Sequence, residues 1–429
     1  MSASAVHVIG AGIAGLSAAT RLSEVGRKVI VHEAASFAGG RCRSYHDPAL
    51  GFVIDNGNHL LLSGNHRALE YLDRIGARET LHDSGAAIFE FADLKSGERW
   101  RLDLGEGRIP WWLFDPKKRV PGTAFGEYFA PLGMFIKGRS ATVGEAMACK
   151  GPLYERLWRP LLTSALNTDP RESSAALTAA LLRETLAAGA KACRPLFAGH
   201  GLASSFVDPA LAFLAARGSA VRFGERLRAI GFEGERAVSL DFDGAPEALG
   251  ADDSLIVSVP PWIAKGLLPG VTAPDEFRGI LNVHFRIAPP AGQPTILGVV
   301  NGEIEWLFAF PDRLSVTISN ADRLIDRPRD ELGAGIWREV AALTGLPPDL
   351  PPWQIVKEKR ATFASTPAQD AKRPDSRTPW ANVALAGDWI QTGLPATIEG
   401  AVRSGYKAAS IILERGAAHP KAGALRASP

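Results

Sequence analysis

Three glycines near the start of the chain have the spacing of a phosphate-binding turn: Gly10, Gly12 and Gly15. They lie between an apolar run at 6–9, which predicts a buried strand, and residues 13–25, whose apolar periodicity predicts a helix. In such a unit the first glycine permits the tight turn and the second lets the backbone approach a pyrophosphate. The third lets the helix pack against the strand, and the helix N-terminus attracts phosphate. We therefore expect a nucleotide at this turn.

An acidic residue stands where a ribose would lie. The apolar run at 29–31 predicts a second parallel strand, and Glu33 follows at its tip. A carboxylate in this place accepts hydrogen bonds from ribose hydroxyls and repels a 2′-phosphate. The pattern therefore disfavours NADP and leaves NAD or FAD as the nucleotide.

Two further segments distinguish these cofactors by resemblance. A Gly39-Gly40-Arg41 turn follows the second strand, and Gly387-Asp388 stands near the end of the chain. Both segments resemble those of the amine oxidase and phytoene desaturase flavoproteins. The resemblance implies FAD as the cofactor, with Arg41 reaching its pyrophosphate. It also implies that Asp388 binds the ribitol or the phosphate.

The helix predicted after Pro395 contains two glycines. Gly400 and Gly405 lie inside it, where glycine destabilises a helix unless a cofactor or a crossing strand packs closely. In the resembled flavoproteins, the N-terminus of this helix faces the flavin pyrimidine, where reduced flavin carries negative charge. Thr397 and Ile398 are therefore expected to bind the cofactor.

The composition is that of a globular protein with little net charge. The 429 residues exceed one typical domain and the formal net charge is +2, so we expect two domains and no nucleic-acid partner. The three cysteines, Cys42, Cys149 and Cys193, lack metal-ligand spacing, which predicts a reducing compartment and no metal. Neither a signal peptide nor a bilayer-spanning apolar run is evident, so we expect a cytoplasmic protein.

The nucleotide motifs lie at both ends of the sequence, so the domain that contains them must be discontinuous. The expected fold class is α/β: a Rossmann-like FAD-binding domain with a discontinuous α+β substrate domain. Residues 221–230 and 255–259 predict strands of the first domain, and the resemblance places the backbone near Leu227 beside the adenine. The expected parts are an FAD-binding domain of residues 1–60, 200–265 and 380–415, a substrate domain of residues 61–199 and 266–379, and a flexible tail of residues 416–429.

The substrate domain combines helical and strand patterns. Leucines recur at helical spacing in 153–162, and residues 173–186 predict another helix. The expected strands are 279–287, 295–300, 304–310 and 314–319. Helices with an antiparallel sheet are a familiar cap for the resembled fold.

One stretch, 109–139, combines bulky apolar residues with cations. An aromatic run at 109–114 precedes three basic residues, and a second apolar run at 129–136 precedes two more. Aromatic rings suit a membrane interface, and basic groups meet anionic head groups. We therefore expect peripheral contact of 109–139 with the inner face of the cytoplasmic membrane. The alternative is a buried loop with solvated lysines.

A closer resemblance covers nearly the whole chain. Residues 55–62 (DNGNHLLL), 157–168 (LWRPLLTSALNT) and 387–401 (GDWIQTGLPATIEGA) are similar to the squalene-associated FAD-dependent desaturase family. That family commonly has Gln where this chain has Asn58. The resemblance implies a hydrophobic isoprenoid substrate, hydroxysqualene, whose hydroxyl leaves as water while reduced FAD delivers hydride to form squalene for hopanoids. It also implies association with the prenyl synthases of the squalene pathway, and an electron donor that the sequence does not identify.

The acid that protonates the leaving hydroxyl is expected in segments near the flavin. Asp55 and His59 are the first candidates, with His59 as the acid near neutral pH and Asp55 orienting it or binding cofactor. Asn282 and His284 form a second set, because period-two alternation places them on one face of a strand. The alternative for each set is a structural role, in which the side chains hold a turn or are hydrogen-bonded within the strand.

Three other functions stay open. A carotenoid (phytoene-type) desaturase shares the fold and the apolar tunnel. An amine oxidase usually has an aromatic residue just before the Glu-Gly-Ala segment, where this chain has Ala396-Thr397-Ile398 and so lacks one wall of an amine cage. A non-catalytic flavin-binding scaffold has the same cofactor motifs. Product analysis and flavin reoxidation by an allylic alcohol distinguish these functions.

Overall fold

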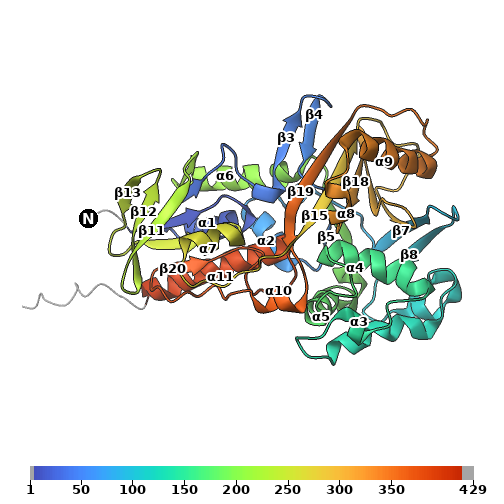
Figure 1. Ribbon diagram of the computed structural model, residues 1–429, viewed down its shortest axis with the longest axis horizontal. Coiled ribbons are helices and arrows are strands. Elements are labelled where there is room, and N and C mark those ends of the chain that lie inside the picture. Colours follow the sequence, from blue (N-terminus) through green and yellow to red (C-terminus); the bar gives the residue numbers. More distant parts are fainter. Residues whose placement is uncertain (1–3, 418–429) are drawn as a thin grey trace, which may run out of the picture.

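A five-stranded parallel sheet carries the nucleotide motifs (Figure 1). The computed structural model describes residues 4–417. In spatial order the strands are β10 (Ala220–Phe223), β2 (Lys28–Glu33), β1 (Ala5–Ile9), β14 (Ser254–Val257) and β20 (Val383–Leu385). β1 is buried along its whole length, as expected for a central parallel strand covered on both faces. The Rossmann-like α/β class is confirmed, and all five strands fall within the three segments predicted for the FAD-binding domain.

Helices cover this sheet and cross one another closely. They are α1 (Ile13–Glu24), α2 (His66–Arg74), α6 (Asp208–Ala215), α7 (Pro261–Leu267) and α11 (Ile398–Ala417). A Cβ atom on Gly405 of α11 would overlap the backbone carbonyl of Ala14 in α1. The close packing expected at this glycine is confirmed, although the packed element is a helix and neither a cofactor nor a strand.

The strand expected at 221–230 is wrong as a single element. The chain turns at Gly224, whose φ of +75° belongs to the left-handed region, so β10 ends at Phe223. β11 (Leu227–Glu233) then starts a separate antiparallel sheet with β12 (Arg236–Phe242) and β13 (Ala245–Ala248). The sequence pattern missed the turn because apolar residues continue on both sides of it.

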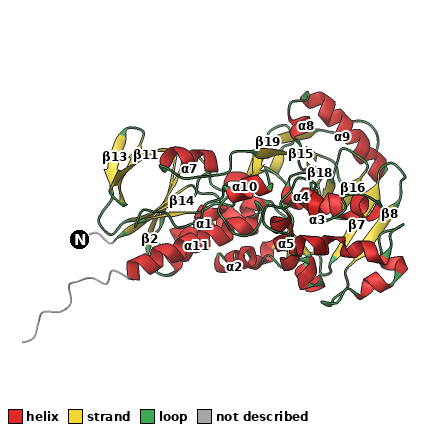
Figure 2. Cartoon of the chain, turned by 60° about the horizontal axis from the view of Figure 1, so that its bottom comes forward, coloured by secondary structure: helices red, strands yellow, loops and turns green. Residues whose placement is uncertain are grey.

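A seven-stranded sheet lies at the opposite end of the long axis (Figures 1 and 2). In spatial order its strands are β19 (Trp353–Phe363), β15 (Phe277–Phe285), β18 (Arg313–Ile318), β17 (Trp306–Phe310), β16 (Ile296–Val300), β7 (Ile88–Asp93) and β8 (Arg99–Asp103). The four strands expected between 279 and 319 are β15, β16, β17 and β18, and every bound agrees within two residues. These strand predictions are confirmed.

The two faces of this sheet have different chemistry. On one face, Leu281, Val283 and Phe285 of β15 pack in a core with α9 (Arg329–Thr344). The alternating residues Asn282 and His284 therefore point to the other face, which confirms that they share a face. On that face, the aromatic residues of β17 pack with helices of the substrate domain: α3 (Val143–Ala146), α4 (Arg159–Leu166) and α5 (Ala175–Glu184). α5 is the helix predicted at 173–186.

Shorter elements connect the two ends of the molecule. They are β3 (Ser44–Asp47), β4 (Phe52–Asp55), β5 (Leu61–Leu62), β6 (Leu81–Asp83), β9 (Pro195–Ala198), α8 (Asp322–Ile325) and α10 (Pro367–Ala371). The predicted tail 416–429 begins inside α11, because that helix extends to residue 417. The rest of the tail, 418–429, lies outside the described residues.

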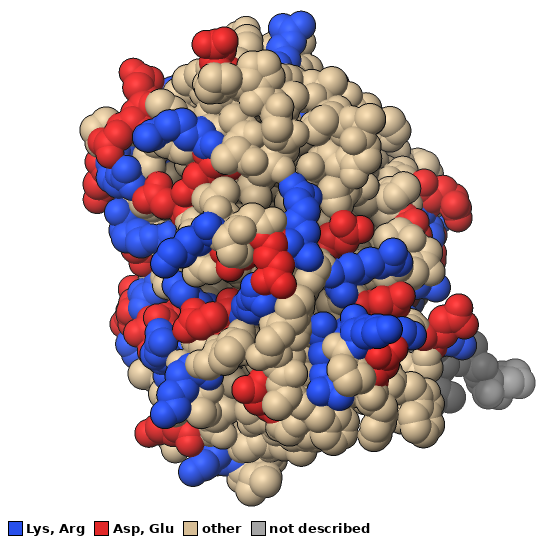
Figure 3. All heavy atoms as spheres, turned by 90° about the vertical axis from the view of Figure 1, so that its right-hand side faces the viewer, with Lys and Arg blue, Asp and Glu red and all other residues tan. Residues whose placement is uncertain are grey.

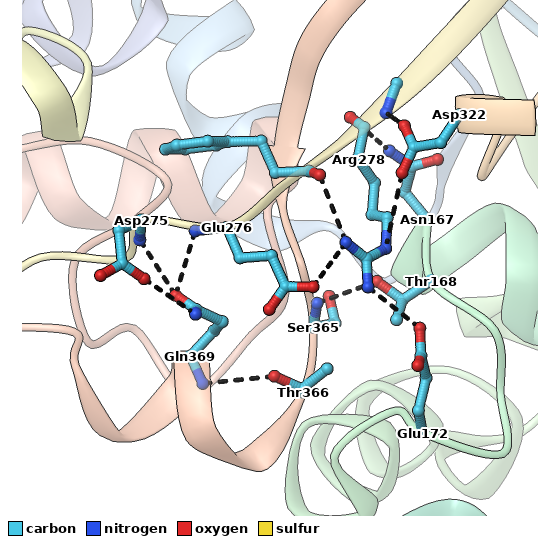
Figure 4. A network of polar contacts seen from close by, with 12 residues as sticks. Asn167, Thr168, Glu172, Asp275, Glu276, Arg278, Asp322, Ser365, Thr366 and Gln369 are labelled. Atoms are coloured by element: carbon cyan, nitrogen blue, oxygen red, sulfur yellow. Dashed lines mark hydrogen bonds and ion pairs between the residues drawn. The ribbon is translucent and has the colours of Figure 1, made fainter.

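A buried polar joint connects α4 to the seven-stranded sheet (Figure 4). Asn167 ends α4 with a φ of +49°, and its side-chain nitrogen donates to the Thr362 hydroxyl at 2.9 Å. Its side-chain oxygen accepts the backbone N–H of Asn320 at 2.6 Å. Thr168 accepts the backbone N–H of Ser365 at 2.9 Å. The end of the 157–168 motif therefore holds the helical cap against the strands.

Between residues 4 and 417, no helix is both long and apolar enough to cross a bilayer. Basic and acidic side chains are interspersed over the end of the molecule that Figure 3 presents, with uncharged areas between them.

Candidate active site

The turn after β1 forms a cradle for a nucleotide. Gly10 has a φ of +100°, and a Cβ atom on it would lie 2.8 Å from the Ser258 carbonyl oxygen. A Cβ atom on Gly15 would overlap the carbonyl of Gly10, so α1 begins in direct contact with the turn. A Cβ atom on Gly12 would meet nothing within 4 Å. Gly12 is therefore the place where the turn is open to a pyrophosphate.

Glu33 lies beside this turn at the carboxyl end of β2. Its carboxylate accepts the backbone N–H groups of Ala11 and Ala35, each at 2.8 Å. Its backbone carbonyl accepts the N–H of Glu225 at 2.9 Å, and Leu227 follows as the buried first residue of β11. The ribose-binding and adenine-binding residues predicted from the sequence are therefore neighbours at one edge of the parallel sheet.

The Gly-Gly-Arg turn and the Gly-Asp segment meet across the same cradle. Gly39 and Gly40 have φ values of +101° and +57°, and the Gly39 N–H donates to the Ala11 carbonyl at 2.8 Å. This geometry directs Arg41 to Asp388, where a guanidinium nitrogen and a carboxylate oxygen are 2.8 Å apart. The ion pair joins residues 347 positions apart in the sequence. It brings a cation and a buried carboxylate to the site expected for the pyrophosphate and ribitol.

Arg373 holds the segment that follows Asp388, and the sequence analysis missed it. Its guanidinium is fully buried, pairs with Asp370 at 2.9 Å, and donates to the backbone carbonyl of Asp388 at 3.4 Å. It also donates to the Thr392 hydroxyl at 3.1 Å. Burial lowers the pKa of Arg373, and the charge of Asp370 opposes that effect. No local pattern marks an arginine whose role is to satisfy the carbonyls of a distant loop.

Side chains in and just before the first turn of α11 hold the start of this helix in place. The Thr397 hydroxyl accepts the N–H of Gly400 at 3.0 Å, so Thr397 caps the helix. The carboxylate of Glu399 accepts the backbone N–H of Ala68 at 2.8 Å, at the N-terminus of α2. Ile398 is the first residue of α11, where backbone N–H groups have no acceptor within the helix.

A row of polar side chains crosses the inner face of the seven-stranded sheet. Asn58 donates through its side-chain nitrogen to the hydroxyls of Ser315 at 2.8 Å and Thr317 at 3.0 Å. Thr317 donates to the Asn282 side-chain oxygen at 2.7 Å, and the Ser315 hydroxyl lies 2.7 Å from Nδ1 of His284. The structure therefore joins the two candidate sets through Asn58, the position that departs from the family pattern.

Asp55 and His59 line a small cavity beside this row. The Asp55 carboxylate is buried and accepts the Ser44 hydroxyl at 2.5 Å and the backbone N–H of Leu202 at 2.8 Å. Apart from Asn58, the remaining walls are apolar: Phe197, Ala198, Leu202, Phe308 and Phe310. The cavity thus combines a carboxyl and an imidazole with walls suited to a hydrocarbon.

The surroundings shift the pKa values of these groups in opposite directions. Burial and the charge of Arg41 lower the pKa of His59 to about 4, so its ring is neutral at pH 7. Burial and Arg313 lower the pKa of His284 to about 4 as well. Burial raises the pKa of Asp55. A charged His59 near neutral pH therefore does not fit, and Asp55 is the cavity group whose pKa is raised.

Comparison of this chain with known proteins shows the family to which it belongs. Residues 13–413 match the family described as flavin-containing amine oxidoreductase. The chain is 55% identical to hydroxysqualene dehydroxylase of Rhodopseudomonas palustris, covering 96% of this chain and 99% of the relative. It is 52% identical to the Sinorhizobium fredii protein of the same name, covering 95% and 98%. This chain belongs to the hydroxysqualene dehydroxylase family of flavoproteins. The predicted cofactor, FAD, is confirmed, and the cradle between Gly12, Arg41 and Asp388 fits it.

Proteins with much lower sequence identity to this chain share its fold. A solved putrescine oxidase variant superposes with a TM-score of 0.72 over 96% of this chain and all of that one, at 17% identity. That likeness shows the fold alone. A probable zeta-carotene desaturase of Synechococcus elongatus is 24% identical over 95% of this chain and 98% of the relative. Carotenoid desaturases are therefore much less similar to this chain than the hydroxysqualene dehydroxylases are.

Proposed function

We propose that this protein is an FAD-dependent hydroxysqualene dehydroxylase, which reduces the allylic alcohol hydroxysqualene to squalene. The observation that carries the proposal is its similarity, at more than half of aligned positions and over nearly the full length, to proteins of that name. The reaction breaks a carbon–oxygen bond, forms a carbon–hydrogen bond and releases water. It therefore consumes one hydride, which carries two electrons and a hydrogen nucleus, and one further proton. Bound FAD, once reduced, supplies the hydride.

We assign the other requirements of this reaction to residues that line the cavity. Phe197, Phe308 and Phe310 give the cavity aromatic walls of the kind that suits an isoprenoid chain. We propose Asp55, a carboxyl that lines this cavity and whose pKa is raised by burial, as the donor of the proton to the leaving hydroxyl. Neutral His59 in the same cavity is suited to orient that hydroxyl through a hydrogen bond.

The proposal also covers location. A cytoplasmic protein in peripheral contact with the inner face of the membrane would meet a hydrocarbon substrate where it dissolves. This arrangement is supported by the surface of residues 109–139, which is described in the next subsection.

The decisive experiment is anaerobic. The purified flavoprotein is reduced with dithionite and mixed with hydroxysqualene in detergent, while flavin absorbance is followed and products are extracted for mass analysis. Flavin reoxidation with formation of squalene supports the proposal. Absence of reoxidation in a preparation that retains FAD contradicts it and makes phytoene-type polyenes the next substrates to test.

Two variants then separate the roles within the cavity. Asp55→Asn should slow the single-turnover reoxidation by about a hundredfold or more, because it removes the proton donor while keeping hydrogen bonds to its neighbours. His59→Ala should reduce turnover less and leave FAD bound. His46→Ala, at an exposed histidine away from the cavity walls, is the matched control. Equal rates for Asp55→Asn and the unaltered enzyme would exclude Asp55 as the acid.

A further inference from the structure

Half of the large apolar side chains exposed in residues 4–417 gather in one short stretch. Fourteen such residues are exposed in this part of the chain, and seven lie between 109 and 136. We call them the aromatic surface: Ile109, Trp111, Phe114, Phe129, Leu132, Phe135 and Ile136. Trp111 is 68% exposed and Ile136 is 85% exposed. A buried loop, the alternative considered from the sequence, does not fit these values.

The rings of the aromatic surface form a contiguous row. The ring centroids of Trp111 and Phe114 are 5.8 Å apart, and those of Phe114 and Phe125 are 5.1 Å apart. Phe125 and Phe129 follow, again at 5.1 Å. Contact from ring to ring through the half-buried Phe125 joins Trp111, Phe114 and Phe129 in one apolar row, and apolar patches of this kind mark interaction sites.

Four basic residues of 109–139 are exposed, and none of them forms a salt bridge within the part of the chain that the structure describes. They are Lys117, Lys118, Lys137 and Arg139. The two acidic residues of 109–139 bond to the backbone: Asp115 accepts the N–H of Lys117 at 3.0 Å, and Glu127 accepts the N–H of Ala124 at 3.0 Å. Five cations against two carboxylates in this stretch give it a positive charge. The charge complements an anionic surface.

The aromatic surface also adjoins the interior that leads to the active site. Its buried neighbours Leu113 and Met134 belong to the same apolar cluster as Phe308 and Phe310. Those two phenylalanines line the cavity of Asp55 and His59. A single apolar region therefore extends from the exposed rings to the site of the reaction.

We propose that the aromatic surface docks on an anionic lipid bilayer. The rings enter the boundary between head groups and acyl chains, and the exposed lysines and Arg139 contact lipid phosphates. The reason for such docking rests on the proposed function, because an isoprenoid alcohol dissolved in the bilayer can then pass from lipid to cavity without crossing water. The surface itself is an observation independent of that function.

The test is co-sedimentation of the FAD-loaded protein with vesicles. Vesicles of equal parts zwitterionic and anionic phospholipid should bind the protein, and purely zwitterionic vesicles should bind it less. The triple variant Trp111→Ser, Phe129→Ser, Ile136→Ser should bind the mixed vesicles at least about tenfold more weakly, since it removes three large apolar groups. The matched control is Phe223→Ser, Leu350→Ser, which alters exposed apolar residues elsewhere. It should bind like the unaltered protein.

The basic residues are tested separately. Lys117→Gln, Lys118→Gln, Lys137→Gln should reduce binding to anionic vesicles and flatten its dependence on salt concentration. All variants must retain FAD and the unaltered circular dichroism. Failure of the unaltered protein to bind anionic vesicles would overturn the proposal. So would a triple variant that binds as well as the control.

Activity assays distinguish failure of the surface from failure of the proposed function. With hydroxysqualene in detergent, the triple variant should turn over at the unaltered rate. With the same substrate in vesicles, it should be at least about tenfold slower. Vesicle binding without dehydroxylation would refute the function alone. If light scattering instead showed a dimer that the triple variant dissociates, with no vesicle binding, a second copy of this chain would be the true occupant of the surface.

Discussion

At the scale of single residues, Arg41 makes the contact that joins the two ends of the chain at the cofactor site. Arg41→Met keeps the length of the side chain but leaves the carboxylate of Asp388 without its partner at 2.8 Å. An unpaired buried charge is costly, and the cationic contact with the pyrophosphate is lost as well. We expect FAD to bind at least about tenfold more weakly. The ratio of flavin to protein absorbance after gel filtration measures this.

The control for Arg41 is an exposed pair of the same kind. Arg377 and Glu414 are 2.7 Å apart, and more than half of each side chain is exposed. Arg377→Met should leave the FAD content unchanged, because a solvated ion pair contributes little. Full FAD content in Arg41→Met would mean that Arg41 does not bind the cofactor.

The burial of His284 is expected to make the free energy of unfolding depend on pH. Its pKa falls from 6.5 in the unfolded chain to about 4 in the folded protein, because it is buried and close to Arg313. The lowered pKa gives stability that is fully present above pH 6.5 and is lost as the pH falls towards 4. The loss amounts to about 3 kcal/mol. His284→Gln should reduce that loss, as measured by chemical denaturation at pH 7 and pH 4.5.

His82 provides the comparison for His284. It is exposed, so His82→Gln is the control for the loss of an imidazole outside the core. If His284→Gln lost as much stability between pH 7 and pH 4.5 as the unaltered protein, the burial of a neutral His284 would not be a source of acid sensitivity.

At the scale of elements, the crossing of α1 and α11 depends on one glycine. Gly405→Ala would place a methyl group against the carbonyl of Ala14, and a backbone carbonyl cannot rotate away as a side chain can. We expect a loss of at least about 2 kcal/mol in the free energy of unfolding. The crossing also supports the flavin end of α11, so FAD affinity should fall with it.

A second helical glycine makes the matched control. Gly335 lies inside α9, and a Cβ atom there would meet only the end of the Arg338 side chain at 3.9 Å. Gly335→Ala should stabilise the protein by about 0.5–1 kcal/mol, because alanine is the better helix former. The two substitutions are chemically identical, so opposite signs in urea denaturation would isolate the effect of packing. A neutral Gly405→Ala would show that α1 and α11 can separate without cost.

At the scale of the whole molecule, the cofactor site ties together segments that are far apart in the sequence. Gly12, Arg41 and Asp388 come from the two ends of the chain, and Leu227 comes from the middle. A ligand that binds only the folded state adds about 2.7 kcal/mol at a hundred times its dissociation constant. Added FAD should therefore raise the Tm of the apoprotein in a concentration-dependent way. NADP at equal concentration should not, and an unchanged Tm with FAD would contradict assembly of the site from these segments.

The spacing of residues along the chain was sufficient to predict those parts of the protein that are built from neighbours in the sequence. The turn with Gly10, Gly12 and Gly15, the strands around Asn282 and the fold class follow from periodicities that each element carries by itself. The family was also accessible, because its motifs are short continuous segments. The break at Gly224 was missed because one glycine between apolar runs fits a strand and a turn equally well.

Only the tertiary structure decided which groups from different parts of the sequence lie next to one another. It placed Asn58 against Ser315 and Thr317, buried Arg373 beneath the flavin-motif loop, and lowered the pKa of His59 to about 4. Desolvation and charge–charge interactions depend on every neighbour in space, and the strand residues that bind Asn58 lie more than 250 positions away in the sequence. The sequence alone determined which residues were available for chemistry. The fold determined their charge, their partners and the cavity that they share.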